Sequence, residues 1–167
     1  MTAPNFIAHL NLGQAFNGNH NLPEAEHHFF EALKILPDHE CHKALATVLF
    51  EEGDFEEAFF HYSVALRMKP DYAETHASLA NFFENCTNRK YQDRKRASYH
   101  AQRAYQLTKY RRKDFLVLLA GICANDKQYS KAIDAAQKAI EVSVSPQEIQ
   151  ESKSLMTKIH EMQSEKK

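Results

Sequence analysis

The sequence predicts an all-α protein built from repeated helix-turn-helix units. The first observation is a turn, a helix and a stop within residues 53–71, where Gly53 and Asp54 interrupt the preceding pattern and Pro70 prevents the helix from continuing. The second is a stripe in that helix, because a small residue, a large aromatic ring and another small residue stand at i, i+4 and i+7. The third is that this stripe returns along the chain.

The stripe occurs four times with the same internal spacing, although alanine replaces the ring in two copies. The first alanines are separated by 33, 39 and 35 residues, close to the 34-residue period of one class of helix-turn-helix repeats. Small residues let a neighbouring helix approach closely while the ring fills the remaining space. The chain is therefore predicted to be a repeat protein. The stripes are Ala25/Phe29/Ala32, Ala58/Tyr62/Ala65, Ala97/Ala101/Ala104 and Ala132/Ala136/Ala139.

Other residues recur at fixed offsets from the stripes. The first two repeats carry Leu12, Gly13, Phe16 and Pro37, and then Leu45, Ala46, Leu49, Gly53, Asp54, Phe55 and Pro70. The last two keep Leu79, Ala80 and Phe83, and then Leu119, Ala120 and Tyr129. In these residues the chain resembles the tetratricopeptide repeat (TPR) family over roughly residues 6–146. It departs from the family at the tryptophan position, which holds His9, His42, His76 and Leu116.

The resemblance implies a right-handed superhelical solenoid of about four helix-turn-helix TPR repeats plus a C-terminal capping helix. We expect one array over residues 1–167, with repeats at about 6–38, 39–72, 73–112 and 113–145. Pro146 is placed to begin the last helix, which runs to about residue 163, with Ser145 as its cap. Its single apolar stripe is suited to covering the last repeat.

The repeats divide into a first (A) and a second (B) helix each. In repeat one the A helix spans residues 6–16, and Pro23 falls early in the B helix, where a missing N–H is tolerated. In repeat two the A helix spans residues 39–51. Repeat three is longer, since Leu79 and Ala97 are 18 residues apart where the equivalent interval in the other repeats is 13. The five inserted residues, within 86–96, are either a solvated loop or helix extension, or a basic contact site.

Charge is unevenly distributed along the chain. Residues 1–88 carry 4 Lys and Arg against 13 Asp and Glu, residues 89–113 carry 10 against 1, and residues 114–167 carry 7 against 8. The middle segment is a candidate site for phosphate-rich or acidic partners. We call its selected cations the basic band: Arg89, Lys90, Arg94, Lys95, Arg96, Arg111, Arg112 and Lys113.

The composition, 43% hydrophobic and 26% charged, is typical of soluble proteins. The longest apolar run, from Phe115 to Cys123, is too short to span a membrane, and no signal segment opens the chain, so a cytoplasmic location is predicted. The three cysteines form no CxxC pair, which favours small buried thiols. No phosphate loop, nucleophile elbow or zincin motif is present, and the adjacent His27 and His28 cannot chelate together from one helix. We therefore predict no enzyme activity, no catalytic or metal site and no cofactor.

In the TPR family the A helices line a concave groove that binds partners. The residues at the positions with which one subclass clamps a chaperone's C-terminal carboxylate do not match that clamp in either register, and the nearby carboxylates would repel an anion, so that ligand is disfavoured. The groove is instead suited to a basic-amphipathic or extended apolar peptide. The predicted groove residues are Ile7, Leu10, Gln14, Glu40, Lys43, Thr47, Phe50, Glu74, Ala77, Asn81, Glu84, Asp114 and Val117.

On the outer side, Phe30 and Phe60 fall on B-helix positions that the family usually gives to polar residues, and they form a candidate convex patch for self-association or docking. Three functions follow. The favoured one is a non-enzymatic interaction scaffold or adaptor that binds a peptide or protein. The alternatives are a regulatory or targeting TPR segment of a larger multidomain protein, and a polyanion-binding module that uses residues 89–113. Nucleic acid is a less favoured partner, and association of the chain into a homo-oligomer is a further possibility.

Overall fold

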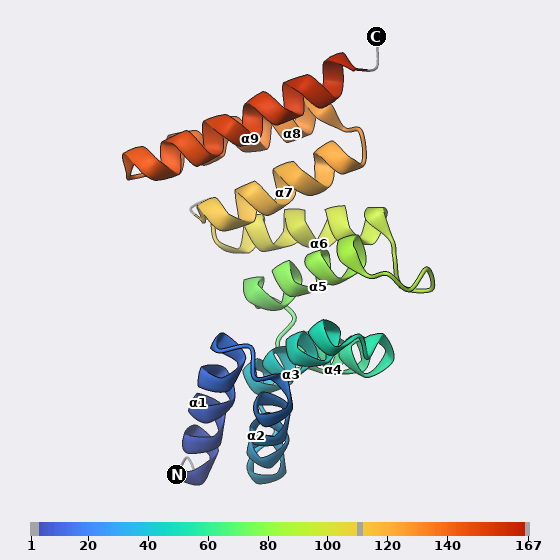
Figure 1. The fold of residues 1–167 in the computed structure, drawn as a ribbon, viewed down its shortest axis with the longest axis vertical. Coiled ribbons are helices and arrows are strands. Elements are labelled where there is room, and N and C mark those ends of the chain that lie inside the picture. Colours follow the sequence, from blue (N-terminus) through green and yellow to red (C-terminus); the bar gives the residue numbers. More distant parts are fainter. Residues whose placement is uncertain (1–3, 110–111, 166–167) are drawn as a thin grey trace. The chain divides into compact units, whose positions relative to one another are not determined.

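The structure, a computed structural model, describes residues 4–109 and 112–165. Within these residues it contains nine α-helices and no strand, which confirms the predicted all-α class (Figure 1). The helices alternate with short turns except after α5, where residues 86–93 form a longer loop. The helices are α1 (Pro4–Gly18), α2 (Leu22–Ile35), α3 (His39–Glu52), α4 (Phe55–Met68), α5 (Ala73–Asn85), α6 (Arg94–Leu107), α7 (Lys113–Asn125), α8 (Tyr129–Val142) and α9 (Pro146–Ser164).

The chain forms two compact units. Unit 1 contains α1 to α4, α5 as far as Ser78, and the loop segment Cys86–Tyr91. In unit 1, α1 packs on α2, α3 packs on α4, α2 packs on α3, and α1 also touches α3. Unit 2 contains Leu79–Asn85 of α5 and the chain from Gln92 onward. In unit 2, α6 packs on α7, α7 on α8, and α9 on both α7 and α8.

The alanine stripes form the core of each unit. All twelve stripe residues are buried, and none is more than 1% exposed. Since the alanines carry no side chain beyond Cβ, the helices of a pair can pack closely around the rings of Phe29 and Tyr62. The positions that the spacing predicts to be packed between helices are therefore buried in the structure.

Helix ends follow local signals in the sequence. The Asp38 carboxylate accepts hydrogen bonds from the backbone N–H groups of Glu40 and Cys41, both at 2.9 Å, and so caps α3. Gly53 ends α3 at a φ of 89°, a left-handed conformation that costs glycine little. Ser145 and Glu148 form the reciprocal capping box at the start of α9. The predicted start of the last helix at Pro146 is confirmed.

Replacing glycine with alanine is expected to have opposite effects on stability at two glycines that lie within helices. A Cβ added to Gly13 would lie 2.6 Å from Cε1 of the buried Phe29 ring, whereas a Cβ on Gly121 would meet nothing within 4 Å. We expect Gly13→Ala to lower the free energy of unfolding by about 1 kcal/mol, because the overpacking cost exceeds the gain in helix propensity. Gly121→Ala should raise the free energy of unfolding by about 0.5–1 kcal/mol. Urea unfolding of the two variants tests this, and changes of equal sign would contradict the packing described here.

Candidate interaction surfaces

The predicted groove residues of unit 1 lie on A helices and remain accessible. None of the nine is buried, and Ile7 is 45% exposed. Seven of the nine lie on α1 and α3, two helices that touch each other. We call this set the A-helix face of unit 1: Ile7, Leu10, Gln14, Glu40, Lys43, Thr47, Phe50, Glu74 and Ala77.

The A-helix face combines apolar side chains with carboxylates. Burial, and then the nearby carboxylates of Glu40 and Glu74, raise the pKa of the Tyr72 hydroxyl to about 12. Lys43 is the only Lys or Arg in the set. The side chain of Thr47 is held by a 3.0 Å hydrogen bond with the Tyr62 hydroxyl. The face therefore favours apolar and cationic groups over anions.

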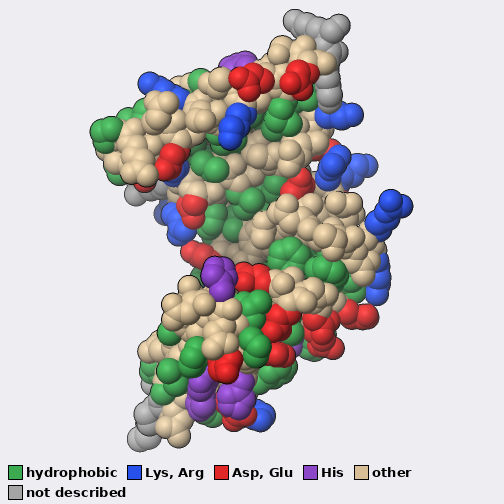
Figure 2. All heavy atoms as spheres, viewed as in Figure 1, with side chains coloured by type: hydrophobic (Ala, Val, Ile, Leu, Met, Phe, Trp, Pro, Cys, Tyr) green, Lys and Arg blue, Asp and Glu red, His purple; other side chains and the backbone are tan. Residues whose placement is uncertain are grey.

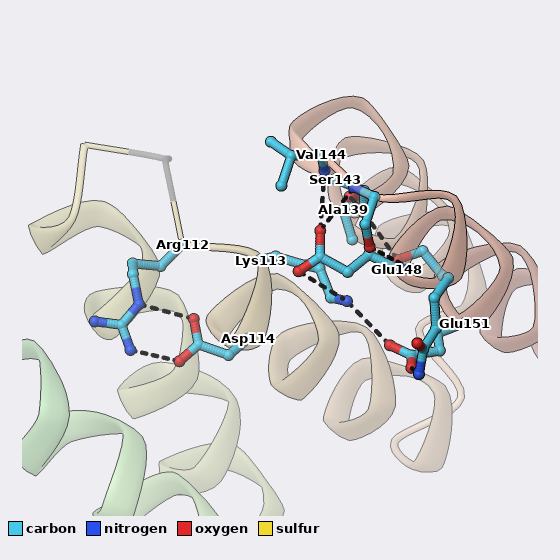
Figure 3. Close-up of polar contacts among 11 residues, drawn as sticks. Arg112, Lys113, Asp114, Ala139, Ser143, Val144, Glu148 and Glu151 are labelled. Carbon is cyan, nitrogen blue, oxygen red and sulfur yellow. Dashed lines mark hydrogen bonds and ion pairs between the residues drawn. The ribbon is translucent and has the colours of Figure 1, made fainter.

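The predicted groove residues in unit 2 have partners within the unit. Asn81 accepts a hydrogen bond from the Asn85 amide at 2.7 Å, and Glu84 accepts one from the Asn125 amide at 2.7 Å. Asp114 accepts two hydrogen bonds from Arg112, at 2.9 and 2.6 Å (Figure 3). The remaining member, Val117, is half-buried. These side chains are thus engaged in contacts within unit 2.

The C-terminal end of the basic band is engaged with carboxylates. Arg112 holds the pKa of Asp114 below its usual range, and its guanidinium lies 4.6 Å from the centre of the Phe115 ring. Figure 3 shows Lys113 between Glu148 and Glu151 of α9, with Nζ–O distances of 3.8 and 3.1 Å. Lys113 is half-buried, so its charge serves to join α7 to α9.

The rest of the basic band lies around residues 86–96, apart from Arg111, which is outside the described residues. Lys90 lies 3.6 Å from the Glu56 carboxylate. Arg94, Lys95 and Arg96 form the first turn of α6, which contains no acidic residue and is capped by Asp93. Arg96 also lies over the Phe83 ring, 3.9 Å from its centre. Arg89, Arg94, Lys95 and Arg96 are exposed.

The two phenylalanines of the predicted convex patch meet the same imidazole in unit 1. The Phe30 and Phe60 rings stand edge-on to His61, with centroid distances of 6.2 and 5.2 Å. Phe30 is 41% exposed and Phe60 is 53% exposed, while His61 is only 7% exposed. The two residues, from the B helices α2 and α4, therefore both lie against one histidine ring.

A hollow of about 430 Å³ lies beside Phe60 on the outer side of α4. Tyr91, from the inserted loop, packs against Phe59 with ring centres 5.5 Å apart and is 7% exposed. We call this feature the α4 hollow, and it was not predicted from the sequence. The one available signal was that Tyr91 is the single aromatic residue in the inserted basic segment. The hollow is lined by Glu56, Glu57, Phe59, Phe60, Ser63 and Tyr91.

Histidine pairs link the A and B helices of repeats one and two. The Nδ1 atoms of His9 and His28 are 3.0 Å apart, and those of His42 and His61 are 2.8 Å apart. Each pair is separated by 19 residues, and this repeated spacing is the signal in the sequence from which the pairs could have been predicted. Burial, and then the neighbouring histidine, lower the pKa of His61 to about 4. In a hydrogen bond between two Nδ1 atoms, one atom donates and the other accepts, so at most one ring of the pair can be a positively charged imidazolium.

The cysteines are free thiols, and no metal-binding group is found in the part of the chain that the structure describes. Cys41, Cys86 and Cys123 are free and buried, and burial raises the pKa of Cys41 to about 12. Over residues 4–109 and 112–165, no group of three or more His, Cys, Asp and Glu side chains is arranged to hold a metal ion. Among the same residues, no helix has both the length and the apolar character needed to cross a membrane. The cytoplasmic location stays a prediction.

Comparison with known proteins defines the class of the fold. No protein-family model matches the sequence, and no curated protein sequence matches it. Among solved structures, TTC0263 of Thermus thermophilus, a TPR protein, is similar at 18% identity with a TM-score of 0.75, over 93% of this chain and 81% of that chain. The pilF protein of Pseudomonas aeruginosa is similar at 22% identity with a TM-score of 0.78, over 94% and 70% of the two chains.

A tetratricopeptide repeat protein from Parabacteroides merdae is also similar, at 14% identity with a TM-score of 0.70. The match covers 95% of this chain and 61% of that protein, so the chain spans less than two thirds of it. The chain therefore has the TPR fold, and the resemblance predicted from the stripes is confirmed at the level of the fold.

Proposed function

We propose that the protein is a non-enzymatic scaffold that binds a protein or peptide partner along the A-helix face of unit 1. The observation that carries this proposal is that all nine side chains of the face remain accessible, although neighbouring positions on the same helices are fully buried. Surfaces of this kind in stacked helical repeats are used for extended contacts. The packing of unit 1 needs none of these nine positions to be buried.

The chemistry of the face defines the kind of partner. Ile7 and Leu10 supply apolar contact on α1, while Glu40 and Glu74 supply negative charge. Figure 2 shows carboxylates gathered over unit 1 on the face that it draws. An extended or amphipathic peptide that alternates apolar and basic side chains would satisfy both properties. We propose that such a peptide is the partner.

Selection of peptides from a random phage-displayed library tests this proposal. We expect the selected peptides to be rich in Lys, Arg and aliphatic residues, and to bind at least tenfold more weakly to Ile7→Lys. The matched control is Ile35→Lys, because Ile35 is 39% exposed on α2 in the same unit but lies outside the A-helix face. Equal loss of binding in both variants, or in neither, would contradict the proposal.

A second candidate function, polyanion binding, is favoured by the first turn of α6. Three consecutive cations stand there, although the positive end of the helix dipole disfavours cations at this end. An acidic partner would gain from both charges and dipole. The polyanion would contact Arg94, Lys95 and Arg96 rather than Arg112 and Lys113, which pair with carboxylates in unit 2.

The Lys95→Glu substitution tests whether the cations of the first turn of α6 bind a polyanion or are only solvated by water. We expect the substitution to raise the free energy of unfolding by about 0.3–1 kcal/mol, because an acidic residue replaces a cation at a helix N-terminus. The same substitution should weaken heparin binding and reduce its salt dependence. Lys153→Glu, an exposed reversal in α9, serves as the control. Unchanged heparin binding by Lys95→Glu would remove this candidate.

A further inference from the structure

We propose that the α4 hollow is a second binding site, which takes an arginine side chain presented by a basic segment of a partner protein. The hollow lies on the B helix α4 and the inserted loop, and so it is separate from the A-helix face. The loop contributes Tyr91 as one wall, and the packing of Tyr91 on Phe59 holds this part of the insertion against α4.

Aromatic rings line this site and suit a flat cation. Phe60 is 53% exposed, while Phe59 and Tyr91 pack against each other beside it. A planar guanidinium binds the face of such rings through cation–π attraction and stacking. Elsewhere in the protein, arginine side chains adopt this arrangement over the Phe83 and Phe115 rings, with distances to the ring centres of 3.9 and 4.6 Å.

Carboxylates at the rim add charge complementarity. Glu56 is paired with Lys90 at 3.6 Å, whereas Glu57 has no ion pair with any residue of the described chain. Unit 1 as a whole carries 6 Lys and Arg against 12 Asp and Glu over its described residues. The hollow therefore lies in a negative field that attracts cations and repels anions.

The presence of Glu56 and Glu57 has another explanation, but that explanation does not account for the exposed ring of Phe60. Glu56 and Glu57 occupy the first turn of α4, where acidic residues stabilise a helix through its dipole. Repeat one has Glu24 at the position equivalent to Glu57, one residue before the first stripe alanine, and Glu24 is not among the residues that line the α4 hollow. Glu24 therefore provides a control that keeps the helix effect and lacks the site.

The experiment titrates ¹⁵N-labelled protein with benzylguanidinium and follows its backbone amides by NMR. We expect chemical-shift changes at Phe59, Phe60, Ser63 and Tyr91, with a Kd on the order of 1 mM, as befits a fragment of this size. Binding should weaken about tenfold in Phe60→Ala and several-fold in Glu57→Gln. It should be unchanged in Glu24→Gln, and also in Ile7→Lys, which disables the A-helix face and so separates the two proposals.

Two further small molecules and a second hollow serve as controls for the titration. Benzyl alcohol and phenylacetate keep the ring but are neutral and anionic, and both should bind more weakly than benzylguanidinium. Unit 2 has a hollow of about 410 Å³ lined by residues that include Tyr99, Arg103 and Lys131. Amides there should not shift with benzylguanidinium, since its basic lining repels a cation.

Three outcomes would overturn the proposal. The first is the absence of shifts at the α4 hollow, and the second is equal binding of benzyl alcohol, which would make the hollow a merely apolar surface. The third concerns a second copy of the chain as the occupant. If sedimentation shows self-association that Phe60→Ala or benzylguanidinium abolishes, the arginine comes from another copy and not from a separate partner.

Discussion

Lowering the pH from 7 to 4.5 is expected to reduce the free energy of unfolding by roughly 2–3 kcal/mol through one side chain, His61. This residue is 7% exposed, and its ring stacks on His42 at a centroid distance of 5.1 Å. Burial, and then repulsion by a charged His42, lower the pKa of His61 from 6.5 to about 4. The folded state therefore binds this proton less readily than the unfolded chain does.

The direction of the pH dependence follows from this difference in pKa between the folded and unfolded chain. The stabilisation is complete above pH 6.5 and is lost progressively as the pH falls toward 4, where the folded protein also takes up the proton. His42, whose pKa is also lowered by burial, adds to the same trend.

Urea unfolding at pH 7 and pH 4.5 measures this loss, and His61→Asn is the comparison. The Asn amide can still hydrogen-bond to His42 but does not titrate. The pH-dependent loss should be smaller in the variant by roughly 2–3 kcal/mol. Equal losses in the two proteins would show that the His42–His61 contact does not shift the titration.

Truncating Ile159 is expected to destabilise unit 2 by about 2–5 kcal/mol, since Ile→Ala removes buried methylenes and leaves a cavity. Ile159 is 1% exposed on α9, which packs on α7 and α8. Leu155→Ala provides the matched control, because Leu155 is a half-buried aliphatic residue of the same helix that lines an open surface hollow.

The control should cost less than about 1.5 kcal/mol in urea or thermal unfolding, because its side chain already contacts water. If Leu155→Ala costs as much as Ile159→Ala, the apolar stripe of α9 does not act as the cover of the last repeat. A change of light scattering on heating the Ile159→Ala variant would report the exposure of the face that α9 covers.

The fold could be predicted because its determinants are local and periodic. Ala58, Tyr62 and Ala65 predict their own burial by their spacing, and Pro146 with Ser145 predicts where α9 begins. These signals need only residues within a few helical turns of one another. The outer and inner positions of each helix follow from the same period.

The surfaces could be predicted only in part, since they depend on contacts between segments far apart in sequence. Charge counting grouped Lys113 with Arg94, but Glu148 and Glu151 engage Lys113 from 35 or more residues away. The five-residue insertion was located by spacing, yet nothing in the pattern showed that Tyr91 packs on Phe59. Such contacts depend on loop geometry, which periodicity does not encode.

The chain crosses between the two units three times, after Ser78, after Asn85 and after Tyr91. Neither unit is therefore a continuous stretch of sequence. No single cut in a gene that encodes this chain would yield both units intact, because a fragment that ends at Ser78 loses the loop residues that pack on α4. A recombination event that exchanged one whole unit would therefore need more than one crossover within the chain.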